Sequence, residues 1–182
     1  RTLCDRFELL VRAAAKEHFT RADGSEVQKL VFLDMEEYRD LAITVETFLR
    51  TLDRSGLEMA GAGIALQAYL PDSFAAQRRI TEWAMRRVDA GGAPVSLRLV
   101  KGANMEMEQL EAAIHNWPVT PYDNKLDVDA NFKRMVDFGM RPENITAVNL
   151  GIASHNLFEL AYAFMLAQYF NVTEHFSFEM LK

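Results

Sequence analysis

The sequence predicts an α/β fold with a parallel sheet, and three observations support this prediction. Short apolar runs rich in β-forming residues alternate along the chain with longer stretches of helical periodicity. Strands that read as apolar runs and are separated by helices are typical of a parallel sheet covered on both faces. The chain has 182 residues, 49% of them hydrophobic, which is enough for one domain with a buried core.

The first part of the chain supplies two of the expected strands. Apolar residues with helical spacing predict a helix over 3–14, and turn-forming residues follow at 20–25. A short apolar run at 29–33 predicts the first buried strand. The stretch 36–52 carries its apolar residues on one helical face, and the second strand is expected within 63–69.

The second part of the chain repeats this alternation. Turn and cap residues at 71–73 begin a helix that ends near residue 90, where a Gly-Gly-Ala-Pro segment breaks it. The remaining predicted elements are a strand over 95–100, a helix over 104–115, a helix over 127–138, a strand over 145–152, a helix that Asn156 caps, and a strand over 176–181.

Composition excludes several classes of protein. The formal net charge of -6 argues against nucleic acid as a partner, because phosphate binding needs a basic face. The single cysteine, Cys4, rules out an internal disulfide scaffold, and no pair of histidines has metal-ligand spacing. No run approaches about 18 uninterrupted apolar residues, and the charged first helix does not resemble a signal peptide. The expected location is the cytoplasm, with no metal site.

Polar residues at the predicted strand ends favour a barrel over a doubly wound sheet. Both architectures fit the alternation of elements, but a doubly wound sheet usually carries a phosphate loop directly after a strand, whereas Gly61-Ala62-Gly63 precedes its strand. In a (β/α)8 barrel the active site lies where the strands end. We therefore predict a partial (β/α)8 TIM-type barrel with about five of its eight strands, and expect the chain to be a piece of a longer one.

Five strand-end residues are candidates for chemistry. Arg98 and Lys101 lie three positions apart at the end of one strand, and buried cations need anions, either carboxylates within the fold or a bound anionic ligand. Gln67 lies in an otherwise apolar strand and needs a hydrogen-bond partner. The alternatives are structural: Asp34 caps a helix or forms an ion pair with Arg98, and His155 is a satisfied structural histidine.

Spacing alone leaves two enzyme hypotheses open. The first is a Schiff-base lyase with Lys101 as its nucleophile, because a lysine at a barrel strand end suits imine chemistry. The second is an anionic cofactor, phosphate or flavin, that lies across the strand ends. Arg98 and Lys101 would then be its charge partners, and Gln67 would bind a heteroaromatic edge.

Motifs at the strand ends resemble the proline dehydrogenase family. The resemblance begins near Lys29, and the order and strand-end placement of its motifs agree with the family. The residues of these motifs are most similar to those of the proline dehydrogenase domain of bacterial bifunctional PutA-type proteins. These proteins also carry an aldehyde dehydrogenase, of which this sequence contains no part. The matching motifs are Leu33-Asp34-Met35-Glu36-Glu37, Leu66-Gln67-Ala68-Tyr69-Leu70, Arg98-Leu99-Val100-Lys101-Gly102-Ala103, Ala153-Ser154-His155-Asn156 and Phe178-Glu179-Met180-Leu181.

The resemblance implies a distorted (β/α)8 barrel that holds FAD at the carboxyl ends of its strands. It implies oxidation of L-proline to Δ1-pyrroline-5-carboxylate, with hydride transfer to flavin N5 and electrons passed to quinone. Residues 1–182 would then be the central portion of the barrel domain. The parent protein would be cytoplasmic and would contact the inner membrane peripherally.

By motif position, Asp34 and Arg98 match the family's catalytic pair, with Arg98 near flavin N5. Glu179 is a further candidate for the surroundings of cofactor or substrate. The cofactor contacts that the resemblance implies are Met35 through its backbone, Gln67 through a hydrogen bond to the ring system, and Lys101, Gly102, Ala103, Ser154 and His155.

The sequence also departs from the family pattern. Asn104 stands where the family often has an aromatic residue, and Ser154 replaces a threonine. The family binds the substrate carboxylate through a lysine on an earlier strand and two arginines of a late R-R-x-x-E helix; the string at 78–82 comes too early and is interpreted as chance. The isolated segment is therefore expected to be inactive. The alternatives are a non-catalytic partial barrel that folds or self-associates without FAD, and the Schiff-base lyase.

Overall fold

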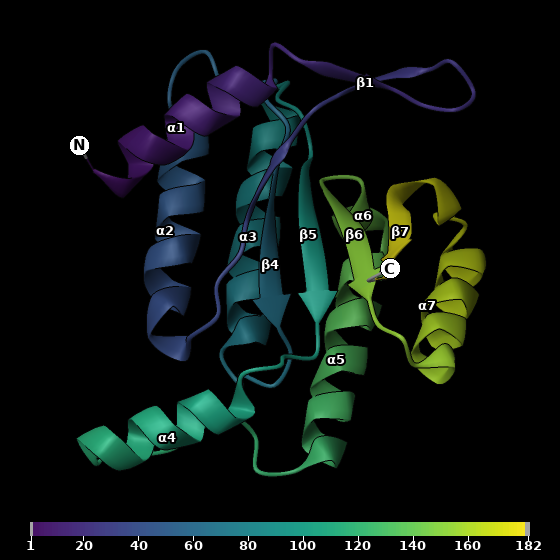
Figure 1. The fold of residues 1–182 in the computed structure, drawn as a ribbon. Coiled ribbons are helices and arrows are strands. Elements are labelled where there is room, and N and C mark those ends of the chain that lie inside the picture. The colour runs from purple at the N-terminus through teal and green to yellow at the C-terminus, as the bar shows by residue number, and fades with distance from the viewer. Residues whose placement is uncertain (1, 181–182) are drawn as a thin grey trace.

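The computed structural model describes residues 2–180, and its centre is a five-stranded sheet with helices packed against it (Figure 1). The helices are α1 (Leu3–Ala14), α2 (Leu41–Leu52), α3 (Ser73–Asp89), α4 (Met105–His115), α5 (Lys125–Met140), α6 (Pro142–Ile145) and α7 (Leu157–Phe170), with 3-10 turns η1 (Tyr38–Asp40) and η2 (Thr173–His175). The strands are β1 (His18–Thr20), β2 (Glu26–Gln28), β3 (Val31–Leu33), β4 (Ala62–Gln67), β5 (Val95–Val100), β6 (Val148–Ala153) and β7 (Phe176–Glu179).

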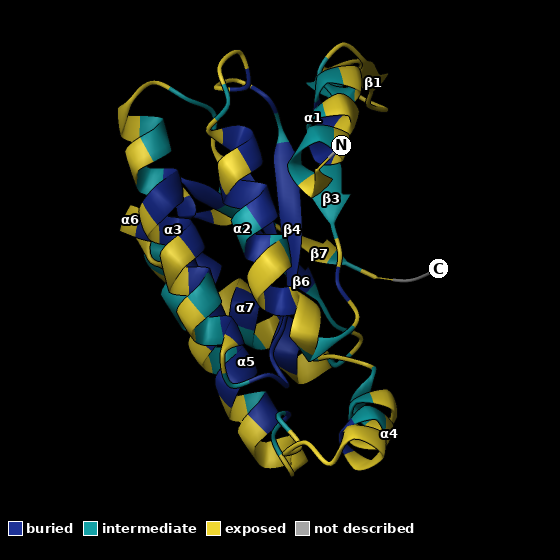
Figure 2. Cartoon of the chain, turned by 90° about the vertical axis from the view of Figure 1, so that its left-hand side faces the viewer, coloured by how far each residue is buried: buried dark blue, intermediate teal, exposed yellow. Residues whose placement is uncertain are grey.

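The sheet strands follow one another in chain order, and every neighbouring pair is parallel. The order is β3-β4-β5-β6-β7, and a helix lies between each strand and the next. The helices α2, α3 and α5 cover the same face of the sheet (Figure 2). A doubly wound sheet would reverse its strand order and carry helices on both faces. The structure is therefore part of a TIM-type barrel, as the strand ends predicted, and the doubly wound alternative is wrong.

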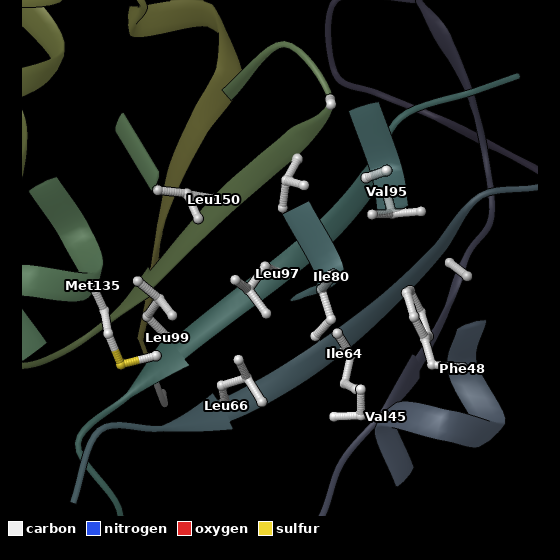
Figure 3. Close-up of a cluster of buried hydrophobic side chains, with 14 of the residues drawn as sticks. Val45, Phe48, Ile64, Leu66, Ile80, Val95, Leu97, Leu99, Met135 and Leu150 are labelled. Atoms are coloured by element: carbon white, nitrogen blue, oxygen red, sulfur yellow. The ribbon is translucent and has the colours of Figure 1, made fainter. Parts of the chain in front are cut away.

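The hydrophobic core fills the space between the sheet and these helices. Along β5, the buried side chains Val95, Leu97 and Leu99 alternate with the half-buried Ser96, Arg98 and Val100, because successive side chains of a strand point to opposite faces. The helices contribute Val45, Phe48, Ile80 and Met135, and β4 and β6 contribute Ile64, Leu66 and Leu150 (Figure 3). Arg98 consequently points away from this core, onto the opposite face.

Most predicted elements are confirmed, with small shifts at their ends. The strand predicted over 95–100 is found at those residues, and Asn156 caps α7 by accepting a hydrogen bond from the Phe158 amide. The strand predicted over 145–152 begins later, because Pro142 starts the helical turn α6 and β6 begins only at Val148. Part of the strand predicted over 176–181 lies outside the described residues.

A pair of short strands outside the main sheet was not predicted. The turn expected at 20–25 joins β1 and β2 into an antiparallel hairpin, whose side chains are largely exposed. Each strand has only three residues and a single apolar side chain, which is too short for a period of two to be recognised. Within residues 2–180, no helix combines the length and the apolar composition needed to cross a membrane.

Candidate active site at the strand ends

A cavity of about 440 Å³ lies at the carboxyl ends of the sheet strands. The predicted site residues Asp34, Arg98, Ser154 and His155 all line it, together with Glu179. They come from the ends of β3, β5, β6 and β7, which are far apart in sequence. Because parallel strands all end at the same edge of a sheet, the fold itself brings these side chains together.

Arg98 is held on the open face of the sheet by two side chains. Its guanidinium lies 4.4 Å from the centroid of the Phe32 ring, and its Nε forms an ion pair with Glu179. The register places Ala65 and Gly151 beside it on β4 and β6. These small residues leave room above the sheet for the ion pair. Phe32 and Glu179 then hold the guanidinium in the lining of the cavity.

Asp34 is not the ionic partner of Arg98. Its Oδ1 accepts a hydrogen bond from the Met35 amide at 3.0 Å, and its side chain is exposed at the rim of the cavity. The structural alternative of an ion pair between Asp34 and Arg98 is therefore wrong, and the carboxylate that binds Arg98 is that of Glu179. Asp34 does share the strand-end cavity with Arg98.

Gln67 has one satisfied and one unsatisfied polar atom. It is the last residue of β4 and is 7% exposed, and its Nε2 donates a hydrogen bond to the Met35 carbonyl. Its Oε1 is buried and has no hydrogen-bond partner among the described residues. The register pairs Gln67 with Val100, which lines the cavity. A buried acceptor without a donor costs roughly 1–3 kcal/mol, so this position suits a ligand N–H donor.

Lys101 obtains its anions from within the fold. Its Nζ forms ion pairs with Asp129 and with Glu159, the latter at 3.1 Å. Burial lowers the pKa of Lys101, but the hydrogen bonds to Asp129 and Glu159 outweigh that effect, and the net shift is upward. Sequence reasoning missed both carboxylates. They lie on α5 and α7, and nothing in their local sequence distinguishes them from the other acidic residues.

Gly102 and Ala103 follow Lys101 in an exposed loop. Gly102 has φ +114°, and a Cβ there would lie 2.0 Å from the Tyr69 ring. Both the backbone conformation and the close approach of the ring require glycine at this position. The Tyr69 amide also donates to the Lys101 carbonyl at 2.8 Å, which attaches this loop to the segment after β4.

Ser154 and His155 form the turn between β6 and α7. The Ser154 hydroxyl accepts a hydrogen bond from the Asn156 amide at 3.1 Å, and the His155 ring is exposed at the cavity. The cavity thus presents one fixed cation, two carboxylates and an imidazole. The described residues contain no group of histidine, cysteine and acidic side chains that could hold a metal ion. The arrangement suits binding of a polar organic molecule that offers both hydrogen-bond donors and acceptors.

Known proteins share the sequence family and the fold of this chain. A sequence model of the proline dehydrogenase family matches residues 6–182. The structure of proline utilization A (PutA) from Corynebacterium freiburgense is similar, with 44% identity and a TM-score of 0.89 over 99% of this chain and 18% of that one. For PutA from Bdellovibrio bacteriovorus inactivated by N-propargylglycine, identity is 34% and the TM-score 0.84, over 98% of this chain and 17% of that one.

A more distant structure shows the fold alone. PutA from Bradyrhizobium japonicum has 23% identity and a TM-score of 0.67, over 82% of this chain and 15% of that one. No curated protein sequence matches the chain. The chain spans less than a fifth of the length of the first two PutA structures.

Proposed function

The chain belongs to the proline dehydrogenase family, and from this premise we propose that residues 1–182 form the central portion of an FAD-dependent barrel that oxidises L-proline to Δ1-pyrroline-5-carboxylate. Two electrons and two protons leave proline in this reaction. When bound, FAD supplies the electron acceptor. Transfer of the electrons to quinone, a cytoplasmic location and peripheral contact of the parent protein with the inner membrane are parts of the same proposal. They rest on the family resemblance.

The residues at the strand ends fit a flavin. The unpaired Oε1 of Gln67 is a buried acceptor that suits the ring N–H of an isoalloxazine. Arg98 is a fixed cation on the same face of the sheet, beside a cavity of about 440 Å³. Gly102 lets the backbone of the Lys101–Ala103 loop pack closely against the Tyr69 ring, which fixes the position of this loop at the strand ends. The single observation that carries the proposal is this pairing of an orphaned acceptor with a fixed cation at the strand ends.

Arg98 has the main catalytic role in this proposal. Its guanidinium stabilises negative charge that develops next to it, and it is positioned in advance by Phe32 and Glu179. Asp34 lies at the rim of the same cavity and orients polar groups there. The Met35 backbone, which already accepts from Gln67, would contact the cofactor beside that amide.

The two loops complete the proposed cofactor site. Lys101, Gly102 and Ala103 contact the cofactor from the end of β5, and Ser154 and His155 contact it from the end of β6. Ser154 keeps a hydroxyl where the family often has threonine. Its hydroxyl already accepts from the Asn156 amide, so its own proton remains available for donation.

The Schiff-base alternative is disfavoured by the surroundings of Lys101. A lysine that forms an imine must be neutral when it attacks, and such lysines usually lie in apolar or cationic surroundings that lower their pKa. The carboxylates of Asp129 and Glu159 instead raise the pKa of Lys101. Trapping with borohydride in the presence of carbonyl substrates is expected to leave Lys101 unlabelled, and its labelling would restore the lyase hypothesis.

Flavin titration tests the proposal. The 182-residue chain is expected to bind FAD weakly or not at all and to reduce no dye with proline, because the residues that bind the substrate carboxylate in this family are not found in it. A longer chain that includes the late R-R-x-x-E helix is expected to be yellow and to be bleached by proline. A longer chain without bound flavin would refute the assignment of FAD. A yellow, proline-reducible 182-residue chain would refute the expected inactivity of the segment.

The other proposed state is a non-catalytic partial barrel that self-associates. The specific observation in its favour is that β3 and β7 each have one edge without a neighbouring strand among residues 2–180. Pairing of edges between two copies would then give a dimer without FAD. Sedimentation of the flavin-free chain distinguishes this state from a monomer.

A further inference from the structure

A cluster of five charged side chains lies outside the lining of the strand-end cavity. It joins the end of β5 to α5 and α7, and we call it the lysine–carboxylate cluster. Its members are Lys101, Lys125, Asp129, Lys133 and Glu159. Three cations meet two carboxylates in this cluster, so it keeps one net positive charge next to the proposed cofactor loops.

Glu159 is the most buried member of the cluster. Its side chain is only 2% exposed, although it lies in the first turn of α7. Both of its oxygens are bound: Oε1 accepts from Lys101 at 3.1 Å, and Lys133 Nζ lies 2.8 Å from Oε1 and 3.0 Å from Oε2. A buried carboxylate remains charged only when it is paired and hydrogen-bonded, and two lysines provide this pairing.

Lys101 is held from two sides by carboxylates on different helices. An ammonium group has three donors, and Asp129 and Glu159 take two of them. Its Nζ also lies 5.6 Å from the centroid of the buried Phe132 ring. These contacts fix a side chain that would otherwise rotate about four bonds, and no third protein acceptor within residues 2–180 binds the remaining donor.

The ion pair between Lys101 and Glu159 connects the two loops of the proposed cofactor site. Lys101 opens the loop that contains Gly102 and Ala103. Glu159 lies four residues after His155, within the helical turn that Asn156 caps. The hydrogen bond between them therefore spans from the end of β5 to the start of α7, and it sets the position of one loop relative to the other.

We propose that Glu159 is a positioning residue, which fixes Lys101 and thereby holds the 101–103 and 154–155 loops in the arrangement that binds the cofactor. This inference rests on the proposed function, in which both loops contact FAD. Glu159 itself does not line the strand-end cavity. Its effect on the cofactor acts through Lys101.

The variant Glu159→Gln tests the inference, with Glu46→Gln as its matched control. Glu46 also binds two cations, Arg50 and Arg79, but on the exposed face of α2. The first readout is the pKa of Lys101 in the chain without cofactor. It is measured by a pH titration in which the NMR signals of isotopically methylated lysines are observed. Loss of the Glu159 charge is expected to lower the pKa of Lys101, because a nearby anion favours the ammonium form. Glu46→Gln is expected to leave it unchanged.

The second readout is hydrogen exchange in the same cofactor-free protein. Two reporters are suitable: the Tyr69 amide, which bonds to the Lys101 carbonyl, and the amides of residues 158–160 at the start of α7. Glu159→Gln is expected to speed exchange at both. If the single variant does not fold because Lys133 is left unpaired, the double variant Glu159→Gln/Lys133→Gln removes that cation, and the same changes are expected.

The third readout is the dissociation constant for FAD in a longer chain that binds it. Glu159→Gln is expected to raise this constant roughly tenfold, the scale of one hydrogen bond to a charged group. An unchanged Lys101 titration, or faster exchange at only one reporter, would overturn the inference. If Lys101 and both reporters respond but the unsubstituted longer chain binds no FAD, the positioning role stands and the proposed cofactor fails.

Discussion

Gly151 lies directly beneath the ion pair that fixes Arg98, and its substitution by alanine tests that geometry. A Cβ at Gly151 would lie 2.0 Å from Glu179 Oε1 and 2.8 Å from its Cδ. Neither distance is tolerable for non-bonded atoms, so the carboxylate has to move. The carboxylate is the far end of a flexible side chain that is 27% exposed, and it can turn toward solvent. Gly151→Ala is therefore expected to release Arg98 without unfolding the sheet.

The structure sets the size of this effect. Rearrangement of a packed core costs about 1–3 kcal/mol, but here a mobile carboxylate yields instead of the backbone. The ion pair is partly exposed, and such pairs contribute about 0–1 kcal/mol. We expect a loss of about 1 kcal/mol, which corresponds to a fall in Tm of roughly 2–4 °C for a domain of this size. Thermal unfolding followed by circular dichroism measures it.

A double-mutant cycle with Glu179→Gln checks the mechanism. Glu179→Gln is expected to destabilise the original protein slightly and to have almost no effect in the Gly151→Ala background, because the ion pair is already broken there. Equal effects of Glu179→Gln in both backgrounds would mean that the carboxylate had not moved. A loss of more than about 3 kcal/mol in Gly151→Ala alone would mean that the backbone had moved, and would equally refute the reasoning.

Three further predictions concern the loops and the site. Gly102→Ala is expected to cost about 2–4 kcal/mol in urea unfolding, because its φ of +114° is strained for alanine and its Cβ meets the Tyr69 ring; a cost below about 1 kcal/mol would contradict this. Burial raises the pKa of Tyr69 to about 12, so the folded state favours the neutral phenol. The resulting stability is present below the ordinary pKa near 10 and is lost as the pH rises toward 12. In Tyr69→Phe, the free energy of unfolding is expected no longer to fall for this reason as the pH rises from 10 to 12. The same pH dependence in the variant and in the original protein would contradict the role of Tyr69. In a longer chain that oxidises proline, Arg98→Met is expected to lower turnover by orders of magnitude, with stopped-flow flavin reduction as the assay, and unchanged turnover would remove Arg98 from its proposed role.

Sequence patterns located most of the elements and the positions of the candidate residues. Helical and strand periodicity depends on local spacing, so β5 and the capped start of α7 could be predicted without tertiary information. The need of Arg98 and Lys101 for anions was likewise predictable, since a cation at the end of an apolar strand cannot be left unpaired. These inferences require only neighbours along the chain.

The identity of the partners was decided by the tertiary structure. Arg98 binds Glu179, which is 81 positions away, and not Asp34; Lys101 binds Asp129 and Glu159 from two different helices. The register that sets Gly151 and Ala65 beside Arg98 leaves the space that this ion pair needs. The sequence by itself determined which side chains end each strand, because strand ends are local features. Only the tertiary structure decided which of them meet, because the fold selects among many chemically equivalent carboxylates by distance and by face.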